Sequence, residues 1–388
     1  MTGAVDPNGF VPPPYPFDVP PEVREMAAAL PGGAIDLSRG VPCDPVPAVV
    51  ASALAEPGPA RPYPPSVGTP ELLDAVVGWC SRRIDVTLEA EQVGACVGTK
   101  ELVSGLPHLL RLRNPERDTV LHPAVAYPTY AMGAVLAGCR AVPVPLDAEW
   151  RIDLSAVNEA DAARALCLWV NTPGNPAGGL DDLGEAARWG RERGIPVLSD
   201  ECYVEFTWSG PPRSILQHGV EGVLAVHSLS KRSNLAGLRV GFYAGDPDLA
   251  WYLRETRRHQ GFLIPGPAQA AGAAALRDQA HVEVQAARYR RRLEVLVEVL
   301  GAVGVEARMP EGGFYLWAEA PGGDHMTLVR QLASELGVLV SPGTVFGPDG
   351  AGRVRVAAVV TDDDLRWCAV GPTPSPANRP ARTGTGPD

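Results

Sequence analysis

The stretch HSLSKRSNL, residues 227–235, contains Lys231, one of only two lysines in a chain with 34 lysines and arginines. A neutral amine can attack a carbonyl carbon, whereas a guanidinium that stays protonated cannot. Ser228 and Ser230 add two hydroxyls, which could bind an anionic group of the same ligand. The segment therefore indicates covalent amine chemistry at Lys231, although a solvated surface lysine is the alternative when the segment is taken alone.

Two further segments offer groups that suit a polar ring. Asp200, in SDECY at 199–203, follows an apolar run, and a buried carboxylate without a partner is costly. It therefore favours a cationic partner such as a protonated ring nitrogen, although a helix N-cap is the alternative. Asn175, in the Pro- and Gly-rich segment 171–179, could donate an amide hydrogen bond to a ligand or only form a tight turn.

A third segment and one arginine could bind phosphate. Gly98 and Thr99, in VGTKEL, precede a helix-like run, and the free N–H groups at the start of a helix favour anions. A plain helix cap explains the same residues equally well. Arg239 follows Lys231 by eight residues and is a second candidate phosphate ligand.

These groups must be positioned by neighbouring strands. Four short apolar runs end in polar residues, at 119–123, 165–171, 195–201 and 223–230. Helix-like segments separate these runs. Continuous apolar runs are typical of strands buried on both faces, and their alternation with helices predicts an α/β domain with a mostly parallel sheet. Ligands of such sheets bind at the carboxyl ends of the strands. From about residue 268 long helical stretches and short strands predict a second, α+β domain.

The two ends of the chain have a different composition from the rest. Residues 1–24 are rich in proline and predict an extended arm. Residues 371–388 are rich in Pro, Gly and Thr without large apolar side chains, which predicts a disordered tail.

Composition excludes several classes of function. The net charge of −11 argues against nucleic-acid binding. Seven dispersed cysteines without a CxxC pair argue against a disulfide framework and a metal site. No signal peptide or membrane-length apolar run is present, so we expect a cytoplasmic protein with no membrane partner.

Taken together, the motifs resemble those of the fold-type I, class I/II aminotransferases that depend on pyridoxal 5′-phosphate (PLP). SLSKRSNLAGLRVGF is similar to the lysine motif of that family, NPAG to its NP(T)G motif and DECY to its D-x-x-Y motif. The resemblance runs from about residue 34 to about 362. AYPTY and QGFLIPGPAQAA are further similar to the actinobacterial N-succinyldiaminopimelate aminotransferases of lysine biosynthesis.

The resemblance implies a fold and a division of the chain. The fold would be a large domain with a mostly parallel seven-stranded sheet plus a smaller α+β domain. Residues 46–265 would form the large PLP-binding domain, and residues 25–45 with 266–370 the small one.

The resemblance also implies how the cofactor is held. Lys231 would bind PLP covalently and carry a proton from the substrate. Asp200 would pair with the ring nitrogen, Tyr203 and Asn175 would bind the phenolic oxygen, and Tyr127 would stack on the ring. The phosphate ligands would be Thr99, Lys100, Ser228, Ser230 and Arg239.

Substrate binding and assembly follow from the same resemblance. Arg355 would bind the substrate α-carboxylate, with Arg353 as the alternative, and Gly40 and Asn175 would border that group. Tyr63 aligns with a tyrosine that reaches the phosphate of the neighbouring subunit, which implies a homodimer with a shared active site.

The implied activity is amino transfer between an amino acid and a 2-oxo acid. Glutamate and N-succinyl-LL-2,6-diaminopimelate are the expected amino donors. A PLP-dependent lyase or amino-acid oxidase of specialised metabolism is the alternative, because one fold supports several reactions. Residues 361–370 begin like the C-terminal helix of the family and then run into the tail, which is a departure from the family pattern.

Overall fold

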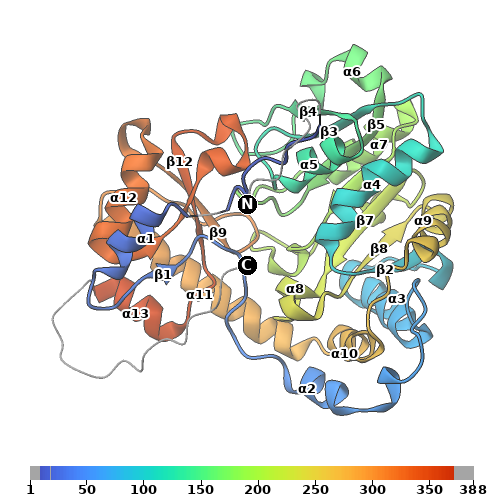
Figure 1. Cartoon of the computed structure of the whole chain (residues 1–388), viewed down its shortest axis with the longest axis horizontal. Coiled ribbons are helices and arrows are strands. Elements are labelled where there is room, and N and C mark those ends of the chain that lie inside the picture. Colours follow the sequence, from blue (N-terminus) through green and yellow to red (C-terminus); the bar gives the residue numbers. More distant parts are fainter. Residues whose placement is uncertain (1–8, 18, 371–388) are drawn as a thin grey trace.

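The computed structural model describes residues 9–17 and 19–370, and its largest element is a seven-stranded sheet (Figure 1). The strand order is β2-β8-β7-β6-β5-β3-β4, and only β8 runs antiparallel to its neighbours. All residues of every strand except the edge strand β4 are buried, which explains the continuous apolar runs. The predicted mostly parallel sheet is confirmed. Its strands are β2 (Val93–Cys96), β3 (Thr119–Pro123), β4 (Arg140–Val144), β5 (Ala165–Asn171), β6 (Val197–Asp200), β7 (Val223–Ser228) and β8 (Gly241–Gly245).

Helices cover both faces of this sheet. One apolar cluster packs α3 (Pro70–Ile84), α7 (Leu183–Arg193) and α10 (Gly266–Arg277) against the sheet. A second cluster holds α4 (Thr99–Arg113), α5 (Thr129–Leu136) and α9 (Pro247–Gln260). Shorter helices are α2 (Ala48–Ala55), α6 (Glu159–Ala163) and α8 (Leu229–Arg232). The sheet is therefore the middle layer of three, as expected for parallel strands buried on both faces.

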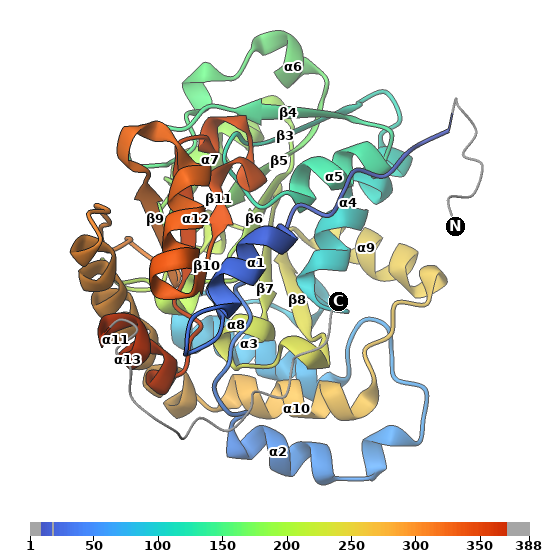
Figure 2. The same cartoon turned by 60° about the vertical axis from the view of Figure 1, so that its left-hand side comes forward.

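A separate apolar core lies in the small part of the molecule, at the left of Figure 1. There β9 (Tyr315–Glu319), β12 (Arg353–Ala357) and β11 (Ser341–Pro342) form an antiparallel sheet, and β1 (Ile35–Asp36) pairs with β10 (Val338–Leu339). The helices of this part are α1 (Pro21–Ala28), α11 (Ala280–Ala302), α12 (His325–Leu336) and α13 (Asp362–Val370). Figure 2 shows α1, from early in the chain, beside α12 and β10.

The N-terminal arm is shorter than predicted. Helix α1 begins at Pro21, where proline suits the first helical turn, so the extended segment stops before the predicted boundary at residue 24. Part of the arm, residues 1–8, and the predicted tail, 371–388, lie outside the described residues. The helix expected to begin near residue 361 is present as α13.

Three of the parallel strands bring polar residues to one edge of the sheet. β5, β6 and β7 are direct neighbours, and Asn171 at the end of β5 is in register with Asp200 at the end of β6. Ser228 ends β7, and α8 with Lys231 follows at once. The strand ends therefore meet as the sequence predicted. Within residues 9–17 and 19–370, no helix is long and apolar enough to span a membrane.

Candidate active site

A cavity of about 630 Å³ lies at the carboxyl ends of these strands, between the large sheet and the small part. Its walls come from the arm, the large sheet and β12, so segments far apart in the sequence share it. Of the residues predicted from the sequence, the cavity is lined by Gly40, Thr99, Lys100, Tyr127, Asn175, Asp200, Tyr203, Ser228, Ser230, Lys231, Arg239 and Arg355.

Lys231 lines the cavity. Its amine donates a hydrogen bond to the carbonyl oxygen of Gly40, which belongs to the loop after β1. Burial lowers the pKa of Lys231 to about 8, and the nearby guanidinium of Arg355 acts in the same direction. A good fraction of the amine is therefore neutral and nucleophilic near pH 8, which is the state that carbonyl chemistry requires.

Asp200 faces the same cavity from the end of β6. Its Oδ2 accepts a hydrogen bond from the hydroxyl of Tyr130 at 2.8 Å, and its Oδ1 accepts one from the backbone N–H of Cys202 at 3.2 Å. Burial raises the pKa of this carboxyl group. A buried carboxylate with two fixed donors and an open side is suited to a cationic ligand group.

A candidate phosphate cradle lines the same cavity as Lys231. Helix α4 begins at Thr99, and its N-cap Gly98 has φ +71°, a left-handed value that favours glycine. A Cβ on Gly98 would overlap the guanidinium of Arg239. Ser228 Oγ accepts from the N–H of Ser230 at 3.1 Å, which fixes this hydroxyl at the cavity wall. Helix N–H groups, hydroxyls and a guanidinium together fit a phosphate.

Arg355 and Arg353 have different surroundings in the structure. Arg355 is buried in the cavity wall, where its Nη1 donates to Asn175 Oδ1 at 2.8 Å and its Nη2 to the Ser38 carbonyl at 2.5 Å. Its Nε has no hydrogen-bond partner among the described residues. Arg353 instead pairs with Glu319 at 2.9 Å, outside this cavity. Arg355 is thus the arginine available to an anionic substrate group.

Two predicted ring ligands make contacts that the sequence did not suggest. The Asn175 side chain orients Arg355, as described above. The hydroxyl of Tyr203 lies 2.9 Å from that of Tyr315. A Cβ on Gly40 would overlap the Tyr315 hydroxyl, so this glycine is required for the close approach.

Tyr63 is the predicted residue that does not line the cavity. Its side chain is 95% exposed. A single chain does not test a contact with a neighbouring subunit, so the role of Tyr63 stays a prediction.

Several residues of the cavity were missed from the sequence. Tyr130 follows Tyr127 by three residues in AYPTY, across the turn that begins α5, and this proximity in the sequence could have revealed it. Tyr15 and Phe17 belong to the arm, where Tyr15 accepts a hydrogen bond from Lys100 Nζ at 3.0 Å. No local signal places an extended segment against a distant cavity, so these two could not have been found.

Tyr130→Phe is expected to destabilise the cofactor-free protein by about 1–3 kcal/mol, because a buried carboxyl group loses a donor. The change keeps the ring, which stacks on Trp169 with centroids 5.1 Å apart. Urea denaturation at a fixed pH measures the effect. Tyr252→Phe, which removes a hydroxyl bonded to the Leu109 carbonyl at 2.7 Å near the surface, is the matched control and should change stability less. Equal effects would contradict the importance assigned to the Tyr130 contact.

The fold and the cavity define a class of protein. A lysine amine, an acidic partner for a ring cation and a phosphate cradle meet at the carboxyl ends of a mostly parallel seven-stranded sheet. This is the set of groups that a PLP-dependent enzyme needs, and the residues present fit that cofactor in charge and chemical type.

Comparison with known proteins identifies the family. The family described as "Aminotransferase class I and II" matches residues 33–369, and the chain belongs to this family, whose members use PLP and exchange amino groups between amino acids and 2-oxo acids. A 4-dedimethylamino-4-oxo-anhydrotetracycline transaminase of Streptomyces rimosus is 42% identical over 92% of this chain and 98% of that protein. A probable aminotransferase of Mycobacterium tuberculosis is 40% identical over 90% of this chain and 83% of that protein.

A solved structure agrees with these relatives. The structure described as a probable N-succinyldiaminopimelate aminotransferase from Thermus thermophilus superposes with a TM-score of 0.80 at 32% identity. The match covers 89% of this chain and 96% of the Thermus chain. The expected fold class and aminotransferase activity are therefore confirmed.

Proposed function

We propose that this aminotransferase binds PLP through Lys231 and uses the same amine to move a proton at the substrate Cα atom. The observation that carries the proposal is that Lys231, Asp200 and Arg355 line one cavity although they lie on three different elements. Bound PLP supplies an electron sink for the carbanion formed at Cα.

The other residues would prepare this chemistry. Asp200 would keep the ring nitrogen protonated, since its carboxylate is held by two donors and faces the cavity. Thr99 and Lys100, through their N–H groups, with Ser228, Ser230 and Arg239, would hold the phosphate. Tyr127 would stack on the ring, and Tyr203 would bind its phenolic oxygen with Asn175.

Arg355 would bind the substrate α-carboxylate. A guanidinium can donate two parallel hydrogen bonds to a carboxylate, which fixes the orientation of Cα relative to Lys231. Asn175 and the Ser38 carbonyl already accept from Arg355, so its fork is oriented before the substrate arrives.

For the substrates, we propose glutamate with 2-oxoglutarate as one pair and N-succinyl-LL-2,6-diaminopimelate with its 2-oxo acid as the other. The Thermus thermophilus structure, named as a probable N-succinyldiaminopimelate aminotransferase, supports this choice. The Streptomyces rimosus relative, named as a 4-dedimethylamino-4-oxo-anhydrotetracycline transaminase, favours a 4-oxo-anhydrotetracycline as a second candidate acceptor. Comparing amino transfer from glutamate to the two acceptor classes distinguishes the candidates.

We also propose a two-fold dimer in which Tyr63 reaches the phosphate of the neighbouring subunit. An almost fully exposed tyrosine at a loop position supports a contact outside this chain. Sedimentation equilibrium tests the assembly, and a fully active monomer would contradict it.

Capture of PLP by the cofactor-free protein should depend on the protonation of Lys231. Because burial lowers the pKa of its amine to about 8, the neutral form gains population as the pH rises through that value. The capture rate, followed by visible absorbance, is therefore expected to rise through pH 8 and then level off. A rate that stays constant between roughly pH 6 and pH 10 would contradict this role of the amine.

Product analysis separates amino transfer from the alternative reactions. With glutamate and a 2-oxo acid acceptor, we expect 2-oxoglutarate and the new amino acid in equal amounts. Release of ammonia without amino transfer would instead indicate a lyase or an oxidase on the same fold.

A further inference from the structure

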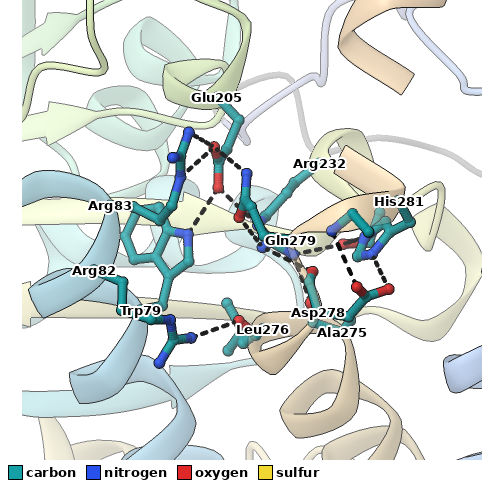
Figure 3. A network of polar contacts seen from close by, with 12 residues as sticks. Trp79, Arg82, Arg83, Glu205, Arg232, Ala275, Leu276, Asp278, Gln279 and His281 are labelled. Atoms are coloured by element: carbon teal, nitrogen blue, oxygen red, sulfur yellow. Dashed lines mark hydrogen bonds and ion pairs between the residues drawn. The ribbon is translucent and has the colours of Figure 1, made fainter. Parts of the chain in front are cut away.

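The residue after Lys231 does not line the cavity and belongs instead to a network of polar side chains (Figure 3). This residue is Arg232, the last of the four-residue helix α8. A single helical turn is not stable by itself, so contacts outside α8 must fix its position. The side chain of Arg232 supplies such contacts to several distant segments.

Glu205 is the centre of the network. Its Oε1 accepts from Trp79 Nε1 at 2.8 Å and from Arg232 Nε at 3.0 Å. Its Oε2 accepts from Arg83 Nη2 at 3.0 Å and from Gln279 Nε2 at 3.3 Å. One carboxylate therefore connects α3, α8 and the segment between α10 and α11 (Figure 3).

The two terminal nitrogens of the Arg232 guanidinium also donate hydrogen bonds. Nη1 donates to the Ala275 carbonyl at 2.8 Å and to Ser233 Oγ at 3.1 Å, and Nη2 donates to Gln279 Oε1 at 3.1 Å. Arg232 is only 4% exposed and Glu205 only 9%, so neither charge is solvated by water to any extent. A guanidinium with this many fixed acceptors has essentially one orientation.

The charges of the network are compatible with burial. Burial alone would raise the pKa of Glu205, but the charge of Arg232 and the hydrogen bond from Trp79 outweigh it and lower that pKa. Glu205 is therefore ionised at neutral pH and pairs with two arginines, of which Arg83 is partly exposed at 29%.

The sequence positions of the pair give it a role in the active site. Glu205 lies on the 3₁₀ turn Val204–Phe206, two residues after Tyr203 and five residues after Asp200. Arg232 directly follows Lys231. The ion pair between Glu205 and Arg232 thus connects the segment that carries Lys231 with the segment that carries Asp200 and Tyr203.

We propose that Glu205 and Arg232 are positioning residues that set the place of the Lys231 amine relative to Asp200 and Tyr203. The inference rests on the proposed function of Lys231 and goes beyond it, because neither residue lines the cavity described above. A displacement of about 1 Å at the reacting amine can lower a rate by about 100-fold, so even a small loss of fixation is measurable.

Arg232→Lys tests the proposal in a folded holoenzyme. Lysine keeps the positive charge beside Glu205 but cannot form the several hydrogen bonds of the guanidinium. The ion pair with Glu205 should therefore remain, while α8 loses its fixed orientation. We expect kcat with glutamate to fall about 10-fold while KM changes less than about 2-fold. The pH midpoint of the visible absorbance of the lysine-linked cofactor should shift as well.

Arg82→Lys is the matched control. Arg82 neighbours Arg83 on α3, but its guanidinium donates to the Leu276 carbonyl at 3.1 Å rather than to the Glu205 carboxylate. Its replacement should leave kcat and the pH midpoint unchanged. The same kcat loss and shift in both variants would overturn the positioning role.

A double variant separates positioning from stability. Glu205→Leu/Arg232→Met removes both buried charges together, a change that often leaves stability close to that of the wild type. We expect a Tm near the wild-type value with kcat still reduced about 10-fold. Wild-type kcat and pH midpoint in Arg232→Lys, or in a double variant that keeps its Tm, would overturn the inference.

Failure of the inference can be distinguished from failure of the proposed function. Lys231→Ala is measured in the same series. If it abolishes amino transfer while Arg232→Lys behaves as wild type, only the positioning role is wrong. If Lys231→Ala keeps its activity, the function proposed for Lys231 is wrong and the inference falls with it.

Discussion

Lys231→Ala is expected to lower amino transfer from glutamate by roughly 10³-fold or more, because the variant has neither the nucleophile nor the group that moves the Cα proton. It should also lose the visible absorbance of the lysine-linked cofactor. The phosphate cradle and Asp200 stay intact in this variant, so PLP can still bind without a covalent link. Single-turnover kinetics and the absorbance spectrum of the purified protein measure both effects.

Lys100→Ala is the matched comparison, since it removes the other lysine of the chain. The Lys100 amine donates to the Tyr15 hydroxyl, and the proposed phosphate contact of this residue uses its backbone N–H. The absorbance should therefore be largely retained. A covalent PLP adduct that persists in Lys231→Ala and disappears in Lys100→Ala would reverse the assignment.

Arg355→Lys is expected to raise KM for glutamate roughly 100-fold, since the buried bidentate site for the α-carboxylate is lost. Lysine cannot satisfy both Asn175 Oδ1 and the Ser38 carbonyl and still offer a fork to the substrate. The effect should be largest in kcat/KM, measured by steady-state kinetics over a series of glutamate concentrations.

Arg353→Lys provides the matched control two residues away on β12. Arg353 pairs with Glu319 and lies over the ring of Trp150, outside the cavity. Its replacement should change KM less than about 3-fold. A larger rise in KM for Arg353→Lys than for Arg355→Lys would show that the carboxylate site is misassigned.

The sequence predicted the parts of the fold that local patterns determine. The buried runs that became β5, β6 and β7 carry their polar residues at their carboxyl ends, and strand neighbours of a parallel sheet bring such ends together. The sequence resemblance favoured Arg355 but left Arg353 as the alternative, because residues two apart on a strand point to the same face. The hydrogen bonds of Arg355 with Asn175 and Ser38, both distant in the chain, distinguish its position from that of Arg353.

The network behind the lysine shows a second limit. Trp79 and Glu205 are 126 residues apart, and nothing in the local sequence of either indicates the other. The arm is a third case, since Tyr15 and Phe17 line the cavity only through tertiary packing. Long-range side-chain contacts, rather than secondary structure, are what the sequence left undetermined.

The most direct test of the account is a single-turnover reaction of the purified PLP-bound protein with glutamate alone. Amino transfer through Lys231 predicts one equivalent of 2-oxoglutarate per active site, no ammonia, and no product from Lys231→Ala. Continuous release of ammonia, or an equal yield of 2-oxoglutarate from Lys231→Ala, would contradict it.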